Sequence, residues 1–222
     1  GHPTPYEVHS FPIFDEDGEV AQVIEYSLDI SERKSVEKKL RREYQLQAVL
    51  YQIASAEQFS KTLEDLCQSI HSFLSEVLDT KNFYIAILDS ELKKLSFPLF
   101  IDEYDDHPGT VDFGRGMTEY MLNSKKSLLA HNDDMVRMDE NGEIALEGTP
   151  AKIWLGTPMR IGDHCVGAIV VQSYDDENHF DEGHVNLLEF VSSQIATSVI
   201  AKQAEDKLAV SERLKELLLD IL

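Results

Sequence analysis

The sequence predicts an α+β fold in which long helices flank an antiparallel sheet. Runs of β-forming residues occur in pairs at 82–101 and 152–174, each pair joined by a turn signal, which is typical of β-hairpins. Helical apolar spacing precedes and follows these strands instead of alternating with them, so a βαβ array is not expected. The 222 residues, 42% hydrophobic and 27% charged, suit one globular core with attachments.

Net charge excludes several classes of partner. The chain carries 41 acidic and 20 basic residues, for a net charge of −21, which opposes nucleic-acid binding and docking on anionic lipid. No apolar run approaches the roughly 18–20 residues needed to cross a bilayer, and no signal peptide is evident, so a cytoplasmic location is expected. The two cysteines, Cys67 and Cys165, lie in helical and strand patterns and are expected to be reduced and buried.

The N-terminal segment predicts a β-hairpin. The stretches YEVHSFPIF (6–14) and VAQVIEYSL (20–28) are rich in β-formers, and Gly18 between them suits a tight turn. A lone hairpin is marginal, so its apolar face is expected to pack on another part of the chain, on a second copy or on a neighbouring molecule. The hairpin is interpreted as the end of a domain that begins upstream. Alternation puts these side chains on that face: Val20, Ile24, Tyr26 and Leu28.

Helical patterns lie on both sides of the predicted sheet. One begins near Ser31, with Asp29 or Ser31 as N-cap, and a second covers about 59–78 with a wider apolar face suited to a sheet. The last begins after Asp181 as N-cap and continues to the end of the sequence. The first and last helices carry narrow apolar stripes, which suit a seam between two copies. The expected seam residues are Leu40, Leu46, Leu50, Ile53, Val210, Leu214, Leu217 and Ile221.

The middle of the chain predicts the strands of the sheet. Thr118 is expected to cap a short helix, TEYMLNS. The segments 102–116 and 131–150 are turn-rich or acidic and are expected to be loops. Strands are expected at 82–89 and 94–101 joined by SELK, at 127–130, and at 152–161 and 164–174 around the turn Gly162-Asp163.

Residues 57–200 resemble a GAF domain. The resemblance rests on FYIAILD, FGRGMTEYMLNSKKSLLAHNDD and WLGTPMRIGDHCVGAIVVQSYDDENHFDEGHVNLLEFVSSQIATSVI, and it implies a GAF-like antiparallel sheet. Residues 6–34 look like the C-terminal part of a PAS domain, through FPIFDEDGEV, a second strand and DISERK at 29–34. The expected organisation is a truncated PAS hairpin (1–30), a signalling linker helix (31–56), a GAF domain (57–200) and an output linker helix (201–222).

PAS and GAF modules joined by helices resemble the sensory part of signalling proteins. The resemblance implies a non-catalytic sensory and dimerisation segment, a parallel homodimer that relays ligand or PAS state to a C-terminal output domain. The end, SERLKELLLDIL, is similar to the approach to a histidine-kinase phosphoacceptor helix, which favours a sensor histidine kinase of a two-component system. A diguanylate cyclase is the alternative, followed by a GAF-type enzyme such as a methionine sulfoxide reductase that uses Cys165.

A small-molecule ligand of such a domain is expected between the sheet and the 102–150 loops. The sequence identifies neither this ligand nor a cofactor. Aromatic residues at strand spacing are more often plain core than ligand contacts. The candidate lining residues are Tyr84, Phe97, Met117, Tyr120, Met121 and Trp154.

Other residues that could carry chemistry have simpler interpretations. Cys165 lies among apolar residues, far in sequence from the other thiol, so a structural role is favoured over a nucleophile. The acidic run at 102–107 could bind a divalent cation, and DENGE (139–143) lacks EF-hand spacing; both are interpreted as solvated loops. FGRG (113–116) is interpreted as a turn rather than a phosphate site, and NHFDE (178–182) departs from the cyclic-nucleotide pattern. Neither His131 nor His164 has a spaced partner for a metal.

Overall fold

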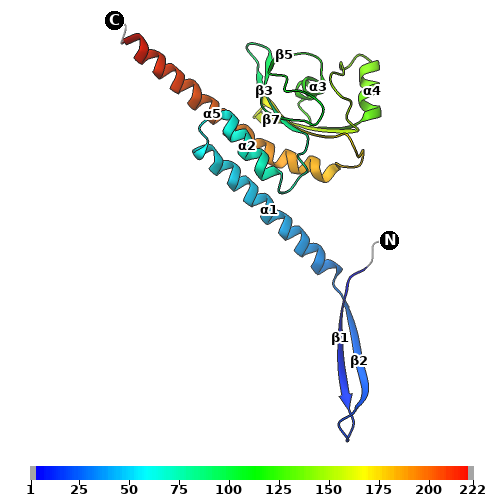
Figure 1. Cartoon of the computed structure of the whole chain (residues 1–222). Coiled ribbons are helices and arrows are strands. Elements are labelled where there is room, and N and C mark those ends of the chain that lie inside the picture. The colour runs from blue at the N-terminus through cyan, green and yellow to red at the C-terminus, as the bar shows by residue number, and fades with distance from the viewer. Residues whose placement is uncertain (1–3, 220–222) are drawn as a thin grey trace. The chain divides into compact units, whose positions relative to one another are not determined.

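The computed structural model describes residues 4–219 and separates into two units. The first, Gly1–Ala48, contains the antiparallel strands β1 (Tyr6–Phe14) and β2 (Val20–Asp29) and the start of helix α1 (Ser31–Phe59). The second, Val49–Leu222, contains the end of α1 and all later elements (Figure 1). In the described part of the chain, no helix is long and apolar enough to span a membrane.

A six-stranded antiparallel sheet organises the second unit and confirms the predicted α+β fold. Its strand order is β5-β4-β3-β8-β7-β6, so the hairpins β3–β4 and β7–β8 meet through the central pair β3 and β8. Both predicted hairpins are present, and Gly162 makes the tight turn between β7 and β8 with a φ of 59°. The strands are β3 (Phe83–Asp89), β4 (Lys94–Ile101), β5 (Thr110–Asp112), β6 (Leu128–His131), β7 (Ile153–Ile161) and β8 (His164–Ser173).

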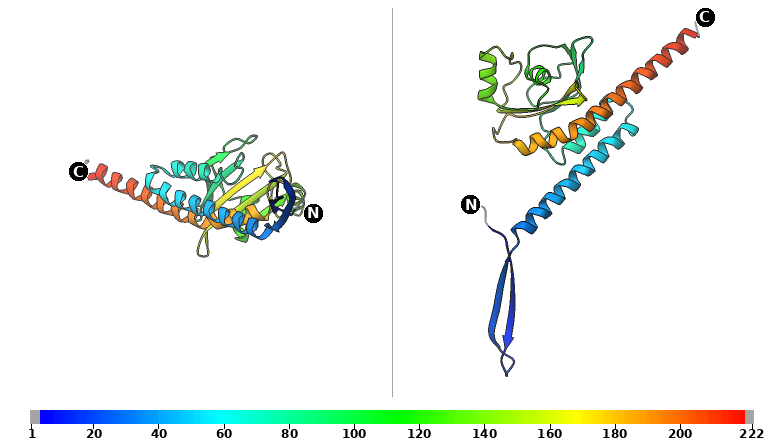
Figure 2. Two further views of the ribbon diagram at one scale, coloured as in Figure 1. Left: turned by 90° about the horizontal axis from the view of Figure 1, so that it is seen from below. Right: turned by 180° about the vertical axis from the view of Figure 1, so that it is seen from behind.

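The two faces of this sheet are covered differently (Figures 1 and 2). Two helices, α2 and α5, pack on one face, and α3, α4 and the loops lie on the other. Because side chains alternate along a strand, Ile85 and Leu155 are buried on the helix face, while Tyr84 and Trp154 join the core on the loop face. The helices are α2 (Leu63–Leu74), α3 (Met117–Ser124), α4 (Asn132–Glu140) and α5 (Glu182–Leu219).

The hairpin of the first unit has the predicted strands and turn but an uncovered face. β1 and β2 pair from Tyr6 opposite Asp29 to Phe14 opposite Val20, and Gly18 takes a φ of 84° in the turn. The four apolar side chains on the predicted face of β2 are each 46–54% exposed. The first unit supplies no cover for this face, so the expected covering contact is not met within that unit.

Asp181 is the N-cap of α5, as predicted, whereas Asp29 lies one position before the N-cap of α1, because Ile30 accepts the first helical hydrogen bond. The carboxylate of Asp29 accepts the backbone N–H of Ser31 across 2.8 Å, and hydrogen bonds from Ser31 lower the pKa of Asp29. The carboxylate of Asp181 likewise accepts the backbone N–H of His184 across 3.1 Å at the start of α5. In both cases a side-chain oxygen accepts a backbone N–H of the first helical turn; the His184 N–H also reaches the backbone carbonyl oxygen of Asp181 at 2.9 Å.

Two predicted helix starts were wrong. Thr62 and Asp65 form a reciprocal capping box, so α2 begins at Leu63 and not near Phe59, which ends α1. Gly116, and not Thr118, is the N-cap of α3. Thr118 lies in the first turn of α3, where it is buried.

Two predicted loops contain regular structure. The segment 102–116 includes β5, which pairs with the edge of β4. The segment 131–150 includes α4, which begins with a reciprocal cap between His131 and Asp134. Met135 and Met138, three residues apart, are buried beneath α4, so this helix is amphipathic despite its acidic sequence.

Candidate functional site

A cavity of about 420 Å³ lies on the loop face of the sheet. Its floor comes from four strands: Tyr84 on β3, Phe100 on β4, Trp154 on β7 and Gln172 on β8. Its walls come from the start of α3 and from the segments 105–108 and 145–151. This is the space between the sheet and the 102–150 loops in which the sequence predicts a ligand.

A hydrogen-bonded chain fixes the floor of the cavity. The indole N–H of Trp154 donates to the hydroxyl oxygen of Tyr84 across 3.3 Å, and the hydroxyls of Tyr84 and Thr118 share a hydrogen bond of 2.9 Å. Burial raises the pKa of Tyr84 to about 12, so the phenol is protonated at neutral pH. The floor therefore presents aromatic rings whose polar atoms are largely committed to one another.

The charged groups around the cavity are all acidic. Among the described residues, four carboxylates line it, and no Lys, Arg or His does so. Glu119 is 8% exposed, and its Oε1 accepts the backbone N–H of Gly114 across 3.1 Å. Within residues 4–219, its Oε2 accepts no hydrogen bond, and this atom is not fully buried. The acidic lining residues are Asp105, Asp106, Glu119 and Glu147.

Asp105 joins two of the loops that enclose the cavity. Its carboxylate accepts the backbone N–H of Thr149 at 3.1 Å and the Thr149 hydroxyl at 2.9 Å. Gly148, beside Thr149, has a φ of 78°, and a Cβ there would lie 2.5 Å from the Asp105 carboxylate. A residue with a side chain would therefore be strained at this position and would crowd the clasp.

Gln172 is held at the floor by a second polar cluster. Its side-chain amide donates to Asp102 Oδ2 at 2.6 Å and is 2.7 Å from the hydroxyl of Tyr174. The Tyr174 hydroxyl also donates to Asp102. Burial, and then the hydrogen bond to Asp102, raise the pKa of Tyr174. Asp102 and Tyr174, which do not line the cavity themselves, therefore fix the side chain of Gln172 in its floor.

The six predicted lining residues divide into two groups. Tyr84, Met117 and Trp154 line the cavity. Phe97 instead packs edge-on against Tyr84, with ring centroids 5.8 Å apart, and Met121 is fully buried behind the floor. Tyr120 is half-buried and does not line the cavity.

The polar residues of the site are not predicted from the sequence. Glu119 precedes a predicted lining residue by one position, and its place in an apolar helical stretch was the available signal. Asp105 and Thr149 are 44 residues apart, and no local pattern links them. The acidic run at 102–107, interpreted as a solvated loop, in fact supplies Asp105 and Asp106 to the cavity wall.

Neither cysteine lines the cavity. Cys67 is fully buried, as predicted, and burial raises the pKa of its thiol to about 12. Cys165 is only partly buried, contrary to expectation, and its thiol lies 3.7 Å from the carbonyl oxygen of Leu122. Burial raises the pKa of Cys165, although Arg160 and Lys125 oppose this effect.

The other singled-out residues have structural partners. Arg115 of FGRG donates to the carbonyl oxygens of Gly142 and Ile144, and so ties two loops together. His131 caps α4, and His164 is exposed at the start of β8. Over the residues that the structure describes, no group of three or more His, Cys, Asp or Glu side chains is arranged to hold a metal ion.

The predicted seam residues of the long helices are in different environments. Leu40, Val210 and Leu214 are 47–69% exposed, while Leu50 is half-buried. Ile53 is fully buried within the second unit, so it is unavailable to a partner copy. The side chains of Leu46 and Leu217, and the whole of Ile221, lie outside the described residues.

Comparison with protein families identifies the second unit. The family model described as GAF domain matches residues 60–199, which covers the sheet, α2 to α4 and the first half of α5. No curated protein matches the chain in sequence.

Solved structures share this fold at low sequence identity. One is the GAF domain of an Acinetobacter phosphoenolpyruvate-protein phosphotransferase (14% identity, TM-score 0.53, 71% of this chain and 93% of that one). A second is a methyl-accepting chemotaxis protein, residues 122 to 287 (15%, 0.55, 69% and 98%). A third is a free methionine-R-sulfoxide reductase from Neisseria meningitidis in complex with its substrate (16%, 0.54, 72% and 91%). At these identities the likeness concerns the fold alone.

Proposed function

This chain belongs to the GAF domain family, and we propose that its GAF domain is a non-catalytic, ligand-binding sensory module of a multidomain signal-transduction protein. The cavity on the loop face of the sheet carries this proposal. Its volume of about 420 Å³ lies in the range of small-molecule sites. Its aromatic floor and few convergent polar groups are also typical of such sites.

The lining favours a small organic cation as the ligand. Four carboxylates and no basic group line the cavity, so an anion would be repelled and a cation attracted. Glu119 is nearly buried at the cavity, and its carboxylate forms no ion pair among the described residues, so it would attract a cationic ligand. The rings of Tyr84, Phe100 and Trp154 line the same space and can add cation–π attraction. An amine or quaternary ammonium compound fits this chemistry.

Trp154 provides a direct test, because it is the only tryptophan of the chain and lies in the cavity floor. Titration with small amines and quaternary ammonium compounds is expected to change its fluorescence saturably, whereas carboxylates of similar size should not. Glu119→Gln keeps the shape and removes the charge, so it should weaken binding about tenfold or more. Glu76→Gln, on an exposed residue outside the cavity, is the control. Equal binding by both variants would refute the proposed ligand class.

The signal is proposed to leave the domain through α5 in a parallel homodimer. This helix packs on β7 and β8, the strands that carry Trp154 and Gln172. Its later turns expose Leu208, Val210 and Leu214, and exposed apolar side chains on one helix favour pairing with a second copy. A ligand that shifts the floor strands would thereby bias the paired helices that lead to the output domain.

Sedimentation analysis of the purified chain tests the dimer. Leu214→Glu should weaken self-association by about tenfold or more, because it places a charge in the apolar seam. Lys215→Glu changes the charge of the same turn more strongly but replaces no apolar residue, and it should leave association nearly unchanged. A chain that sediments as a monomer at high concentration would remove the basis of the relay.

The parent protein is proposed to be a cytoplasmic sensor histidine kinase, with a diguanylate cyclase as the second candidate. The fold occurs in a chemotaxis protein and in a phosphotransferase, which supports a signalling role and is compatible with either output. The uncovered hairpin of the first unit supports a PAS domain before the GAF domain. The residues encoded after Leu222 test the output: a phosphoacceptor histidine supports the kinase, and a cyclase sequence excludes it.

A methionine sulfoxide reductase is the second candidate function, because one such enzyme shares the fold. It requires a reactive thiol at the ligand site. Cys165 does not line the cavity, and burial raises the pKa of its thiol, which lowers the reactive thiolate fraction. Thiol labelling of the folded chain distinguishes the two functions. Rapid labelling of Cys165 together with reduction of free methionine sulfoxide would establish the enzyme instead.

A further inference from the structure

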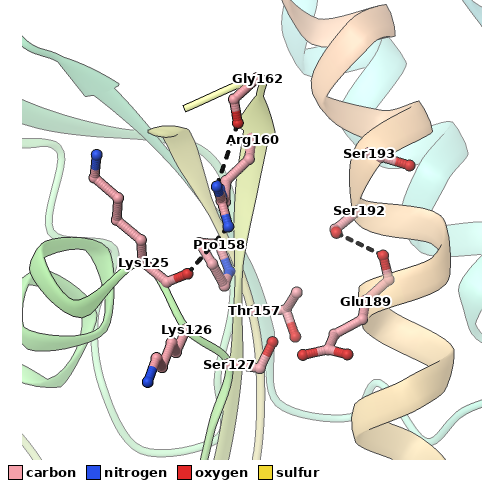
Figure 3. A pocket seen from close by; sticks show the side chains of 10 residues that line it. All are labelled: Lys125, Lys126, Ser127, Thr157, Pro158, Arg160, Gly162, Glu189, Ser192 and Ser193. Atoms are coloured by element: carbon pink, nitrogen blue, oxygen red, sulfur yellow. Dashed lines mark hydrogen bonds between the residues drawn. The ribbon is translucent and has the colours of Figure 1, made fainter. Parts of the chain in front are cut away.

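A second cavity, of about 620 Å³, opens at the edge of the sheet beside α5 (Figure 3). It is formed by the turn between α3 and β6, by the end of β7 and by α5. It shares no lining residue with the cavity on the loop face. It is therefore a separate site that the sensory role does not use.

The cavity exists because β6 is shorter than β7. β6 pairs with β7 only from Ile153 to Gly156, so the edge of β7 beyond Gly156 has no strand beside it. Pro158 lies on this stretch and offers no N–H, which disfavours addition of another strand. Arg160 crosses the open edge and donates to the carbonyl oxygen of Lys125 across 3.4 Å. Side-chain groups, and not free backbone, therefore determine what this cavity binds.

The charges around the cavity contrast with those of the whole chain. The chain has a net charge of −21, yet Lys125, Lys126 and Arg160 line this cavity with only one carboxylate, that of Glu189. Arg160 donates to the carbonyl oxygens of Lys125 and Gly162, and its guanidinium also lies 3.7 Å from the exposed carboxylate of Asp163. A guanidinium has five N–H donors. Donors therefore remain for a ligand. The basic residues come from two separate segments that the fold brings together.

Thr157 provides an independent sign of a ligand. The residue is 1% exposed and lines the cavity, and its Oγ1 has no hydrogen-bond partner among the residues that the structure describes. A buried hydroxyl without a partner is rare and costs stability. In Figure 3 it faces the hydroxyl of Ser127 and the carboxylate of Glu189, while Ser192 donates instead to the backbone carbonyl of Glu189 at 2.9 Å.

We propose that this cavity binds a small phosphorylated molecule that also carries hydroxyl groups. Its phosphate lies beside Arg160, whose guanidinium can form charge-assisted hydrogen bonds, and Lys125 and Lys126 add positive charge to the same side of the cavity. Its hydroxyl groups lie at the other end and bond with Thr157, Ser127 and Glu189. Such a ligand gives the Thr157 hydroxyl a partner, and it keeps its negative charge away from Glu189. It also bridges β7 and α5, the helix proposed to carry the signal.

Isothermal titration of the whole chain with glycerol 3-phosphate, inorganic phosphate and glycerol tests this proposal. Glycerol 3-phosphate should bind about tenfold or more tightly than inorganic phosphate, and glycerol should not bind. Arg160→Gln and Thr157→Val should each weaken binding about tenfold or more. Thr157→Val removes a hydroxyl that has no partner, so its melting temperature should be unchanged or higher. If Thr157 had only a structural role, Thr157→Val would lower the melting temperature and leave binding unchanged.

Arg137→Gln is the matched control, because Arg137 is exposed, paired with Asp134 and remote from the lining. It removes the same charge and should leave binding unchanged. Equal weakening by Arg137→Gln and Arg160→Gln would mean only diffuse attraction and would overturn the site, as would no binding at millimolar concentrations. The cavity on the loop face is acidic and is not expected to bind these anions. A negative result would therefore not count against the sensory role proposed for that cavity.

Discussion

Trp154 and Tyr84 meet side chain to side chain across the strand β8 that separates them in the sheet. The indole N–H reaches the phenol oxygen at 3.3 Å, although the two residues are 70 positions apart and their strands β7 and β3 are not neighbours. Tyr84 then connects to Thr118 on α3. One buried hydroxyl thus ties both hairpins of the sheet to the helix that begins the cavity wall.

Tyr84→Phe should destabilise the GAF domain by about 1–3 kcal/mol. The substitution keeps the ring and leaves two buried groups, the Trp154 N–H and the Thr118 hydroxyl, without their shared partner. Urea unfolding followed by circular dichroism measures the change. Tyr51→Phe, at a side chain that is 75% exposed, should have almost no effect. Equal stability of the two variants would show that the chain of hydrogen bonds contributes little.

Asp105→Ala should loosen the loop around Thr149 without removing the cavity. The carboxylate of Asp105 receives both the N–H and the hydroxyl of Thr149, so its loss should cost about 1–2 kcal/mol locally. Hydrogen exchange of the Thr149 amide should accelerate, and a cation bound in the cavity should dissociate faster.

Asp106→Ala is the control for this variant. Asp106 also lines the cavity and carries the same charge, but it has no hydrogen bond among the described residues. Its substitution should weaken the binding of a cation only through the loss of charge, and it should leave hydrogen exchange of the Thr149 amide unchanged. If both variants accelerated exchange equally, the clasp would not be the cause.

The elements that the sequence predicts well are those fixed by local signals. The turn at Gly162, the N-cap Asp181, the hydrogen bond from Asp29 to the start of α1 and the alternating strands depend on neighbouring residues only. Helix α4 was not predicted, because its acidic sequence resembles a loop and only two buried methionines make it amphipathic. Strand β5 was not predicted, because it has only three residues and is defined by its pairing with β4.

The location of the site could be predicted from the sequence, but the acidic character of its lining could not. The space above the sheet follows from the resemblance, and Tyr84 and Trp154 follow from strand alternation. The carboxylates do not, because an acidic run such as 102–107 gives no sign of which side chains turn inward. Glu119 and Asp105 are positioned by contacts with Gly114 and Thr149, and only the folded chain brings the segments of Asp105 and Thr149 together.

Alkaline pH should destabilise the fold through Cys67. Burial raises its thiol pKa from 9.0 to about 12, so the folded state keeps a proton that the unfolded state releases. The stabilisation is complete below about pH 9 and is lost as pH rises toward about 12, at about 1.4 kcal/mol per pH unit. Tyr84, with a pKa raised from 10.0 to about 12, adds to the loss above about pH 10.

The free energy of unfolding, measured by urea denaturation between about pH 8 and pH 11, checks this slope. Cys67→Ala should lower stability at neutral pH, because it leaves a small cavity, but should flatten the decline above pH 9. A variant with the same decline as the parent would show that the Cys67 thiol does not titrate with unfolding.

Gly167→Ala should prevent close pairing at the centre of the sheet. Gly167 lies opposite Ile87 where β8 meets β3, and a Cβ there would overlap the carbonyl oxygen of Ala86 and lie 2.6 Å from Met159 Cε. Backbone cannot move aside as a side chain can, so the loss should reach about 3 kcal/mol or more. Gly114→Ala, whose Cβ would lie 3.5 Å from the Glu119 carboxylate, should stay within about 0.5 kcal/mol. Thermal unfolding of both variants measures the contrast, and a Gly167→Ala protein as stable as Gly114→Ala would show that the two strands can separate without cost.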